Sequence, residues 1–502
     1  MIAKIKSIVP YGFDGKLVEV EGDTNKGLPA FNIVGMANKT VNEAKERVRS
    51  AIANSSFCFP CKRVTINLAP AELQKDGTYL DLPIALSILI LSGQLIQKDV
   101  SNKLFVGELS LNGELRPIKG IINIIETAKE IGYQEIYVPI KNLPQASLIS
   151  GVKVYGVDTL QNLYLNLKNQ IKLPIAKKPN LSTLNQNSKT QQVLLDHIRG
   201  QKAAKRAMEI AITGHHNILL SGPPGAGKTL LAKSAANLLP ALTSREMVEL
   251  TKIYSIAGLK SDEVVKERPF RNPHHTASQI SIIGGNSGPG EISLAHKGIL
   301  FLDEIPEFSR TVLESLRQPL EDKSISISKA NHKTTYPADF MLVATMNPCP
   351  CGYLNDPTHE CSCSELQIQN YQKRLSGPLF DRIDMTISVE RVDNTNLRTS
   401  IRTSNSEHNV VKNNIIEAID RQKTRYGQGG IYNSSLSSFE VAKYLKLEPA
   451  AEKLLAEASR KLNLSARSYF KTIKVAQTIA DLDDSSIIKQ NHLAEALTYR
   501  RR

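Results

Sequence analysis

The sequence contains no tryptophan, and aromatic residues make up only 5% of its 502 residues. Aromatic stacking is therefore not expected to be its main way of holding a ligand. Six cysteines are too few for a disulfide scaffold in a chain of this length, which indicates reduced thiols or metal ligands. The N-terminus lacks a signal-peptide pattern, and the most apolar stretch, residues 82–96, is too short for a membrane span. We therefore expect a cytoplasmic protein without a membrane segment.

Positive charge is what the sequence has in excess. Lysine and arginine number 63 against 49 acidic residues, which gives a formal net charge of +14. The excess lies in the two ends of the chain, because residues 181–400 are nearly neutral. A net positive charge of this size favours a polyanionic partner such as nucleic acid.

Composition and periodicity divide the chain into three predicted domains. Residues 173–192 are rich in Pro, Asn, Ser, Thr and Lys without a sustained period, which is typical of a linker between residues 1–172 and 193–395. A second polar run after Val392 separates a helical C-terminal domain, residues 396–502. The first domain is predicted to be mixed α/β, and the middle domain alternates apolar strands and helices as a parallel α/β sheet does.

The same patterns predict individual elements. Strands are expected at residues 64–67, 103–106, 135–139, 217–221, 299–303 and 340–345. Helices are expected at residues 41–53, 121–131, 230–239, 438–446, 450–462, 469–482 and 491–500.

A phosphate-binding loop is the strongest motif. A complete G-x-x-x-x-G-K-T follows the apolar strand 217–221 and opens the predicted helix 230–239: Gly222, Pro223, Pro224, Gly225, Ala226, Gly227, Lys228 and Thr229. Glycines allow backbone N–H groups to face phosphate oxygens, the lysine reaches the β- and γ-phosphates, and the threonine binds Mg²⁺. The motif predicts an ATP site.

Two later strands end in residues that such a site needs. Asp303 and Glu304 follow an apolar strand, where the first can hold Mg²⁺ and the second can polarise the attacking water. Asn347 follows the strand 340–345 and can contact the γ-phosphate or orient the water; its alternative role is an Asx-turn before proline.

An arginine close to a helical stretch is a further candidate. Arg382 could stabilise transition-state charge across a subunit boundary, as an arginine finger does. The alternative is a helix-end salt bridge with Asp381 or Asp384.

The ordered motifs GPPGAGKT, LFLDE, ATMN and FDRID resemble those of AAA+ ATPases. An insertion at residues 268–290 and a predicted hairpin at 324–336 narrow the resemblance to the magnesium-chelatase-like branch, and the whole chain resembles the ComM/YifB family. That resemblance implies an AAA+ P-loop core with a helical lid, and a hexameric ATPase implicated in DNA branch migration during natural transformation. It further implies that Arg467 touches the γ-phosphate and that Gly200 and Gln201 line the adenine pocket.

The first domain is similar to the proteolytic domain of Lon proteases at residues 68–83 and 107–120. That fold needs a Ser–Lys dyad, because serine is a weak nucleophile until an amine takes its proton. The resemblance places Tyr79 and Ile122 at the two dyad positions. We therefore expect a Lon-like domain without peptidase activity.

Four cysteines form a C-x-C…C-x-C pattern: Cys349, Cys351, Cys361 and Cys363. Two thiolate pairs joined by a polar, turn-rich loop suit one tetrahedral Zn²⁺, and buried thiols are the alternative. Cys58 and Cys61 have C-x-x-C spacing without a second pair and are interpreted as structural.

Side chains on the insertion and the hairpin are candidates for DNA contact: Arg271, His274, His275, Lys329, His332 and Lys333. Backbone contacts from such residues would bind DNA without sequence preference, and the alternative is an ordinary solvated hairpin. Lys471 and Lys474 are interpreted mostly as a solvated face.

These features predict an ATP- and Mg²⁺-dependent hexameric ring that moves single-stranded or branched DNA, with coupled helicase and branch-migration activity. Two alternative functions remain open. One is a magnesium-chelatase-type motor, although the Lon-like domain and the thiol cluster exceed what such a subunit requires. The other is an ATP-dependent protein unfoldase, which the missing dyad does not exclude.

Overall fold

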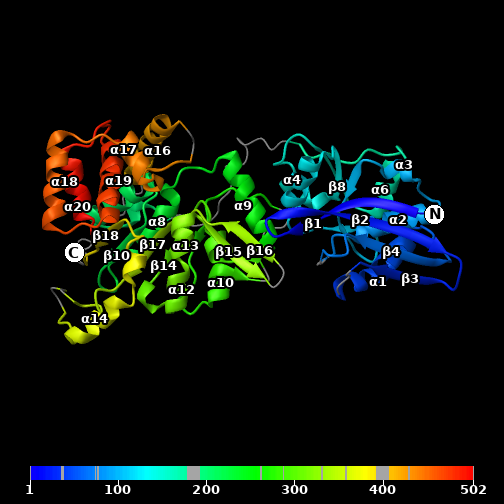
Figure 1. The fold of residues 1–502 in the computed structure, drawn as a ribbon, viewed down its shortest axis with the longest axis horizontal. Helices are drawn as coiled ribbons and strands as arrows, with labels where there is room; N and C mark the ends of the chain where they lie inside the picture. Colours follow the sequence, from blue (N-terminus) through cyan, green and yellow to red (C-terminus); the bar gives the residue numbers. More distant parts are fainter. Residues whose placement is uncertain are drawn as a thin grey trace.

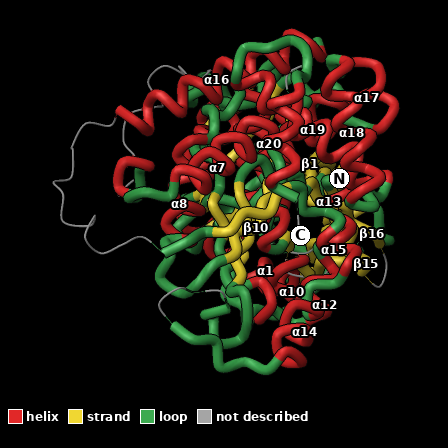
Figure 2. Tube along the Cα trace, turned by 90° about the vertical axis from the view of Figure 1, so that its left-hand side faces the viewer, coloured by secondary structure: helices red, strands yellow, loops and turns green. Residues whose placement is uncertain are grey.

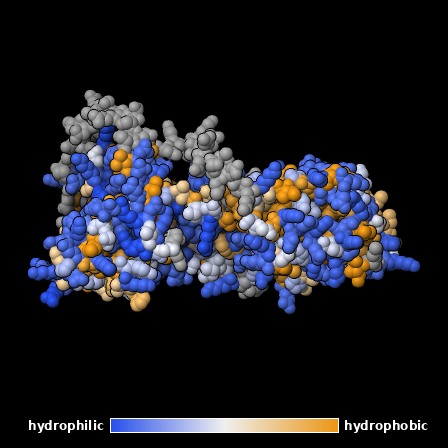
Figure 3. Space-filling model, turned by 90° about the horizontal axis from the view of Figure 1, so that it is seen from above, coloured by the Kyte–Doolittle hydropathy of each residue, from blue (hydrophilic) through white to orange (hydrophobic). Residues whose placement is uncertain are grey.

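The computed structural model describes most of the chain: residues 2–35, 39–73, 75, 78–177, 193–259, 263–285, 288–329, 332–354, 356, 359–391, 406–427 and 430–500. Figure 1 shows an elongated molecule in which the N-terminal domain, the P-loop core and the C-terminal helices follow one another along the long axis. The surface in Figure 3 is mostly hydrophilic, with small scattered hydrophobic areas. Within the described residues, no helix is long and apolar enough to cross a membrane.

The N-terminal domain is built on a seven-stranded mixed sheet with the order β3-β4-β2-β1-β5-β8-β9. Its strands are β1 (Ile2–Tyr11), β2 (Asp14–Asn25), β3 (Ala30–Val34), β4 (Arg63–Ala69), β5 (Lys103–Phe105), β8 (Glu135–Pro139) and β9 (Lys153–Val157). A separate small hairpin pairs β6 (Glu108–Leu109) with β7 (Leu115–Arg116). The mixed α/β prediction is confirmed, and the predicted strands 64–67, 103–106 and 135–139 are β4, β5 and β8.

Helices cover this sheet: α1 (Lys39–Asn54), α2 (Asp81–Leu91), α3 (Gln97–Val100), α4 (Ile121–Ile131), α5 (Leu143–Ala146) and α6 (Leu160–Leu167). Every residue of α2 is buried, so the most apolar stretch of the sequence is a core helix. Asp81 begins it, and Arg47 donates a 3.0 Å hydrogen bond to the carboxylate. Burial raises the pKa of Asp81 to about 6 against this pairing.

The predicted linker is shorter than its composition suggests. Leu173 packs into the core of the N-terminal domain, and the backbone N–H of Ala176 donates to the carbonyl of Val154 at 2.9 Å. Residues 173–177 therefore belong with the first domain. The rest of the predicted linker, residues 178–192, lies outside the described residues.

The P-loop core contains a five-stranded parallel sheet with the order β11-β14-β17-β10-β18. The strands are β11 (Phe270–Arg271), β14 (Ile299–Leu302), β17 (Met341–Met346), β10 (Ile218–Ser221) and β18 (Met385–Ser388). Successive residues of β14 alternate between two hydrophobic cores, with Phe301 in one and Leu302 in the other. Both faces of the sheet are therefore covered, which Figure 2 shows as yellow strands between helices.

One of these two cores is shared with the C-terminal helices. These are α16 (Ser406–Tyr426), α17 (Ser438–Tyr444), α18 (Pro449–Lys461), α19 (Ala466–Leu482) and α20 (Gln490–Thr498). They pack with α7 (Lys202–Gly214) and α8 (Lys228–Leu238). The predicted C-terminal segment is helical, and its helices pack directly on the sheet and share its core.

The opposite face carries α9 (Ser244–Ala257), α10 (Gln279–Ile283), α11 (Glu291–Leu294), α12 (Arg310–Ser315), α13 (Arg317–Asp322), α14 (Glu365–Lys373) and α15 (Gly377–Phe380). The predicted hairpin is confirmed as β15 (Ser324–Lys329) and β16 (His332–Pro337), and the insertion holds a second, two-residue hairpin, β12 (Gly284–Gly285) and β13 (Gly288–Pro289).

The N-terminal domain docks on α9 and on the hairpin β15–β16. Lys252 pairs with Glu126 at 2.7 Å and lies 4.2 Å from the ring centroid of Phe13. The same Phe13 ring meets Tyr336 of the hairpin edge to face. The buried hydroxyl of Ser255 accepts from the backbone of Gly120 at 2.9 Å. This polar and aromatic contact joins the two domains directly.

Candidate active site

The phosphate loop connects β10 to α8. Gly225 and Gly227 have φ angles of 78° and 87°, a region that other residues rarely adopt. A Cβ atom on Gly222 would lie 2.1 Å from the carbonyl oxygen of Val389, so the first glycine allows a close approach of two backbones. These glycines shape a loop of backbone N–H groups at the N-terminus of α8, which is an anion-binding arrangement.

Lys228 begins α8 and is buried. Its ammonium donates to the carbonyl oxygens of Gly222 and Pro223 and to the Asn347 Oδ1 atom at 3.0 Å. Burial lowers the pKa of Lys228, and Asp303 and Glu304 act in the opposite direction. The structure therefore brings the P-loop lysine and the predicted γ-phosphate contact of the third strand together.

The predicted magnesium ligands also converge. The Thr229 hydroxyl donates to the Asp303 carboxylate at 3.2 Å, although 74 positions separate the two residues. Thr345 at the end of β17 donates to the other carboxylate oxygen at 2.5 Å and accepts from the backbone N–H of Glu304 at 2.9 Å. Sequence reasoning missed Thr345; its place two residues before Asn347, at the end of a buried strand, was the available signal.

Gln201 lies beside the phosphate loop. Its amide donates to the carbonyl oxygens of Ala226 and Glu390, the first at 3.3 Å. Gly200 and Gln201 both have positive φ angles, 60° and 55°, and so form a tight turn before α7. The two residues predicted to line the adenine pocket are thus next to the loop.

Arg382 and Arg467 lie together near the N-terminal ends of the strands, whereas the phosphate loop follows the C-terminal end of β10. Arg382 donates to the carbonyl oxygens of Arg317 and Pro378 and to the Glu321 carboxylate at 2.5 Å. Arg467 of α19 pairs with the same carboxylate. The ion-pair partner of Arg382 is therefore Glu321, whereas the sequence suggested Asp381 or Asp384.

Arg382 lies at the opposite end of β10 from the phosphate loop of its own chain. Its carbonyl oxygen accepts from the Asn217 side chain at 2.9 Å, just before β10 begins. The phosphate loop follows the other end of β10. At about 3.3 Å per residue, this four-residue strand separates the two points by roughly 13 Å.

The interpretation of Lys471 and Lys474 as a solvated face is wrong, because both side chains contact the protein. Lys471 donates to the carbonyl oxygen of Ile383 at 2.9 Å and lies 3.7 Å from Asp384, while Lys474 donates to Ser434 at 3.0 Å. Burial lowers the pKa of both lysines. Both lysines hold α19 against neighbouring segments. The prediction failed because a periodic pattern does not distinguish a packed lysine from a solvated one.

The four predicted metal-ligating thiols form one cluster. The sulfur atoms of Cys349, Cys351, Cys361 and Cys363 lie within 4.8 Å of one another. The sulfur atoms of Cys349 and Cys351 are 3.3 Å apart, and that of Cys361 lies 3.6 Å from each of them. Gly352 places this loop against the ATP site, since a Cβ there would lie 2.6 Å from Pro224. Cys58 and Cys61 are exposed free thiols.

The candidate DNA-contacting residues lie on two segments, the insertion and the hairpin. Arg271 donates two hydrogen bonds of 2.6 and 2.7 Å to Glu291, whereas the rings of His274 and His275 contact each other in a tilted arrangement with centroids 4.1 Å apart. Lys333 is exposed on β16. Lys329 and His332 lie at the end of the hairpin, and their side chains are outside the described residues.

The predicted dyad positions of the Lon-like domain hold a half-buried Tyr79 and a buried Ile122. Nearby in sequence, Lys75 is buried and donates to the carbonyl oxygens of Gly35, Leu68 and Pro70. Three acceptors account for all three ammonium protons, so this lysine is held as a structural cation.

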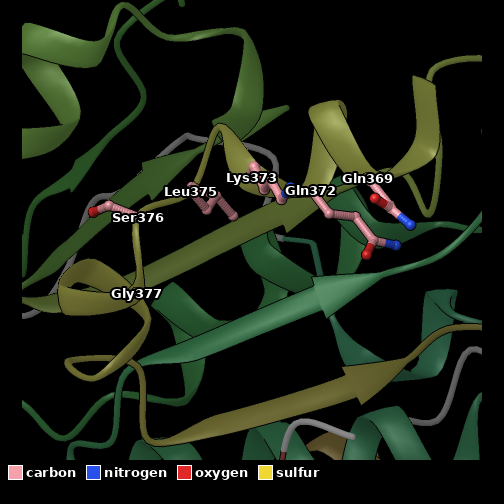
Figure 4. Close-up of a pocket in the computed structure, with 6 residues that line it drawn as sticks. All are labelled: Gln369, Gln372, Lys373, Leu375, Ser376 and Gly377. Carbon is pink, nitrogen blue, oxygen red and sulfur yellow. The ribbon is translucent and has the colours of Figure 1, made fainter. Parts of the chain in front are cut away.

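A pocket of about 350 Å³ lies between the end of α14 and the start of α15. Figure 4 shows its lining residues: Gln369, Gln372, Lys373, Leu375, Ser376 and Gly377. Gln372 donates to the Pro348 carbonyl at 3.4 Å, so the pocket lies next to the segment that carries Asn347 but contains none of the predicted ATP-site residues.

Three family profiles match the chain. "Magnesium chelatase, subunit ChlI" matches residues 194–397, "Subunit ChlI of Mg-chelatase" matches residues 20–142, and "Magnesium chelatase, subunit ChlI C-terminal" matches residues 405–500. Together with the P-loop core, these matches define a magnesium-chelatase-like AAA+ ATPase.

Similar proteins narrow the class. Competence protein ComM of Haemophilus influenzae is 43% identical over 507 residues, which cover 99% of this chain and 97% of that protein. YifB of Escherichia coli is 40% identical over 97% of this chain and 95% of its own length. Lon protease 2 of Bacillus subtilis is 23% identical over 39% of this chain and 40% of its own. The chain belongs to the ComM/YifB family.

Proposed function

We propose that this protein is a cytoplasmic ATPase that forms a hexameric ring and moves branched or single-stranded DNA, driving branch migration in natural transformation and homologous recombination. The observation that carries the proposal is the convergence of Lys228, Thr229, Asp303 and Asn347 at one edge of the sheet. The identity with a protein named for competence supports the DNA-related part.

The roles of the residues at this edge follow from their chemistry. Lys228 would exchange its carbonyl partners for phosphate oxygens, and Thr229 with Asp303 would hold Mg²⁺, which would neutralise the phosphate charge. Glu304 would accept a proton from the attacking water, and Asn347 would orient that water or contact the γ-phosphate. The donor set fits Mg²⁺, which prefers hydroxyl and carboxylate oxygens.

Arg382 and Arg467 would complete the ATP site of the neighbouring subunit. Their position at the opposite edge of the sheet from the phosphate loop supports a role across the subunit boundary. This revises the expectation for Arg467, because its partner is shared with Arg382 and is not in the phosphate loop.

The cysteine cluster is proposed to hold one zinc ion. Four thiolates around zinc at about 2.3 Å in a tetrahedron lie about 3.8 Å from one another. The sulfur atoms of Cys349, Cys351 and Cys361 are 3.3–3.6 Å apart, and all four sulfur atoms lie within 4.8 Å of one another. The ion would fix the loop that packs on Pro224.

DNA contact is proposed for Lys329, His332 and Lys333 of the hairpin and for His274 and His275. Lys333 carries the charge that a phosphate backbone attracts. Arg271 is assigned a structural role through Glu291.

ATP turnover measured without DNA, with single-stranded DNA and with an unfolded protein tests the proposal. Stimulation by DNA is expected, and the Glu304→Gln variant should bind ATP and assemble but not hydrolyse it. Stimulation by unfolded protein alone would favour an unfoldase, and unchanged turnover in Glu304→Gln would reject the assignment of the catalytic base.

A further inference from the structure

We propose that Glu321 is a positioning residue that holds Arg382 and Arg467 together as one cationic pair for the ATP site of the neighbouring subunit. This inference rests on the proposed function of the two arginines. It assigns a role to a residue that no motif of the sequence contains.

Geometry carries the proposal. One carboxylate oxygen of Glu321 accepts from Arg382 at 2.5 Å, and the other accepts from Arg467. The two arginines come from segments 85 positions apart, one before β18 and one in α19, and Glu321 lies on a third segment, α13. A single carboxylate thus joins three elements of the fold.

Charge explains why such a bridge is needed. Two guanidinium groups held close together repel each other, and a carboxylate between them offsets this repulsion. The hydrogen bond and the charge of Arg382, and then the charge of Arg467, lower the pKa of Glu321, so the carboxylate is ionised at neutral pH. The side chains of Glu321 and Arg467 are 44% and 47% exposed, so this end of the bridge is open to an approaching subunit.

Contacts around α13 hold the Arg382–Arg467 pair in place. Arg382 also donates to the carbonyl oxygen of Arg317 at 3.1 Å, one turn earlier on the same helix. Beyond the helix, Lys323 pairs with Asp339 at 3.2 Å, just before β17 begins. Glu321 is therefore anchored near the N-terminal ends of the strands, away from the phosphate loop of its own chain.

Glu321→Gln is the test variant, since it keeps the shape and removes the charge. We expect kcat for ATP to fall by about 10–100-fold, because small misplacements of a transition-state contact cost this much, with KM within about twofold. Asp322→Asn is the matched control, because Asp322 is the next residue on α13 and no ion pair is seen for it in the described part of the chain. Arg382→Ala measures the loss that follows when the arginine itself is removed.

Mixed rings separate positioning across the boundary from a structural role. Glu304→Gln subunits have no catalytic base but present an intact arginine pair. In an equal mixture with Glu321→Gln subunits, about a quarter of the interfaces combine an intact base with an intact pair, so turnover should rise to about a quarter of the wild-type rate. A misfolded Glu321→Gln subunit could not give this rise.

Three results would overturn the inference. In the first, Glu321→Gln keeps the wild-type kcat while Arg382→Ala loses activity; the proposed ATPase mechanism then stands without Glu321. In the second, the Glu321→Gln mixture does not recover while an Arg382→Ala mixture with Glu304→Gln does. In the third, Arg382→Ala itself is fully active, which rejects the proposed arginine role and the Glu321 inference with it.

Discussion

Removing the hydroxyl of Thr345 is expected to damage the ATP site, although the sequence assigns no role to this residue of the ATMN motif. Thr345 is fully buried, donates to Asp303 at 2.5 Å and accepts from the Glu304 N–H at 2.9 Å. In Thr345→Val the shape is kept and both hydrogen bonds are lost. A hydrogen bond to a charged group contributes about 1.5–3 kcal/mol, so kcat should fall by about 10–150-fold if this energy is used in positioning the two carboxylates.

The assay is steady-state ATP hydrolysis over a range of Mg²⁺ concentrations. Because Asp303 loses its orientation, Thr345→Val should also need more Mg²⁺ for half-maximal activity. Thr345→Ser keeps the hydroxyl and should stay within a few-fold of the wild type. Equal activity of the valine variant and the wild type at all Mg²⁺ concentrations would refute the reasoning.

Other predictions concern the metal cluster, the hairpin and the acid stability of the fold. Cys361→Ser should reduce bound zinc well below one ion per chain in metal analysis, while Cys58→Ser should leave it unchanged; full zinc in Cys361→Ser would contradict the four-thiolate site. Lys333→Ala should weaken DNA binding about equally for all sequences and lower the salt slope by about 1, and an unaltered slope would exclude a phosphate contact. Burial would raise the pKa of Asp339, but His215, Lys323 and Lys297 outweigh it and hold the pKa below its ordinary 3.8. Because the folded pKa is lowered, its stabilisation is present above about pH 4 and is lost below it; thermal unfolding should therefore show Asp339→Asn as less stable than the wild type at pH 7, with a gap that narrows on acidification, and a constant gap would contradict this.

Elements with strong apolar periodicity were predictable from the sequence. The helix at residues 121–131 and the strand at 135–139 have the predicted bounds. The helix after the phosphate loop begins at Lys228, two residues earlier than expected, because motif residues form its first turn. The long helix α16 was not predicted as one element, since its sequence is rich in asparagine and charge and its packing partners, α7 and α19, are distant in sequence.

The candidate site was predictable where a motif fixes residue types at fixed spacing. Lys228, Thr229, Asp303 and Asn347 converge because their strands end at the same edge of a parallel sheet. Glu321 has no such signal, because a lone glutamate on a short helix looks like an ordinary surface residue until folding brings both arginines to it.

The measurement that tests the central claim most directly follows a mobile four-way DNA junction incubated with the purified protein and ATP. The wild type should convert the junction to migrated products, and Glu304→Gln should leave it intact while still binding it. A wild-type protein that hydrolyses ATP at a rate unaffected by DNA and leaves the junction unchanged would contradict the account.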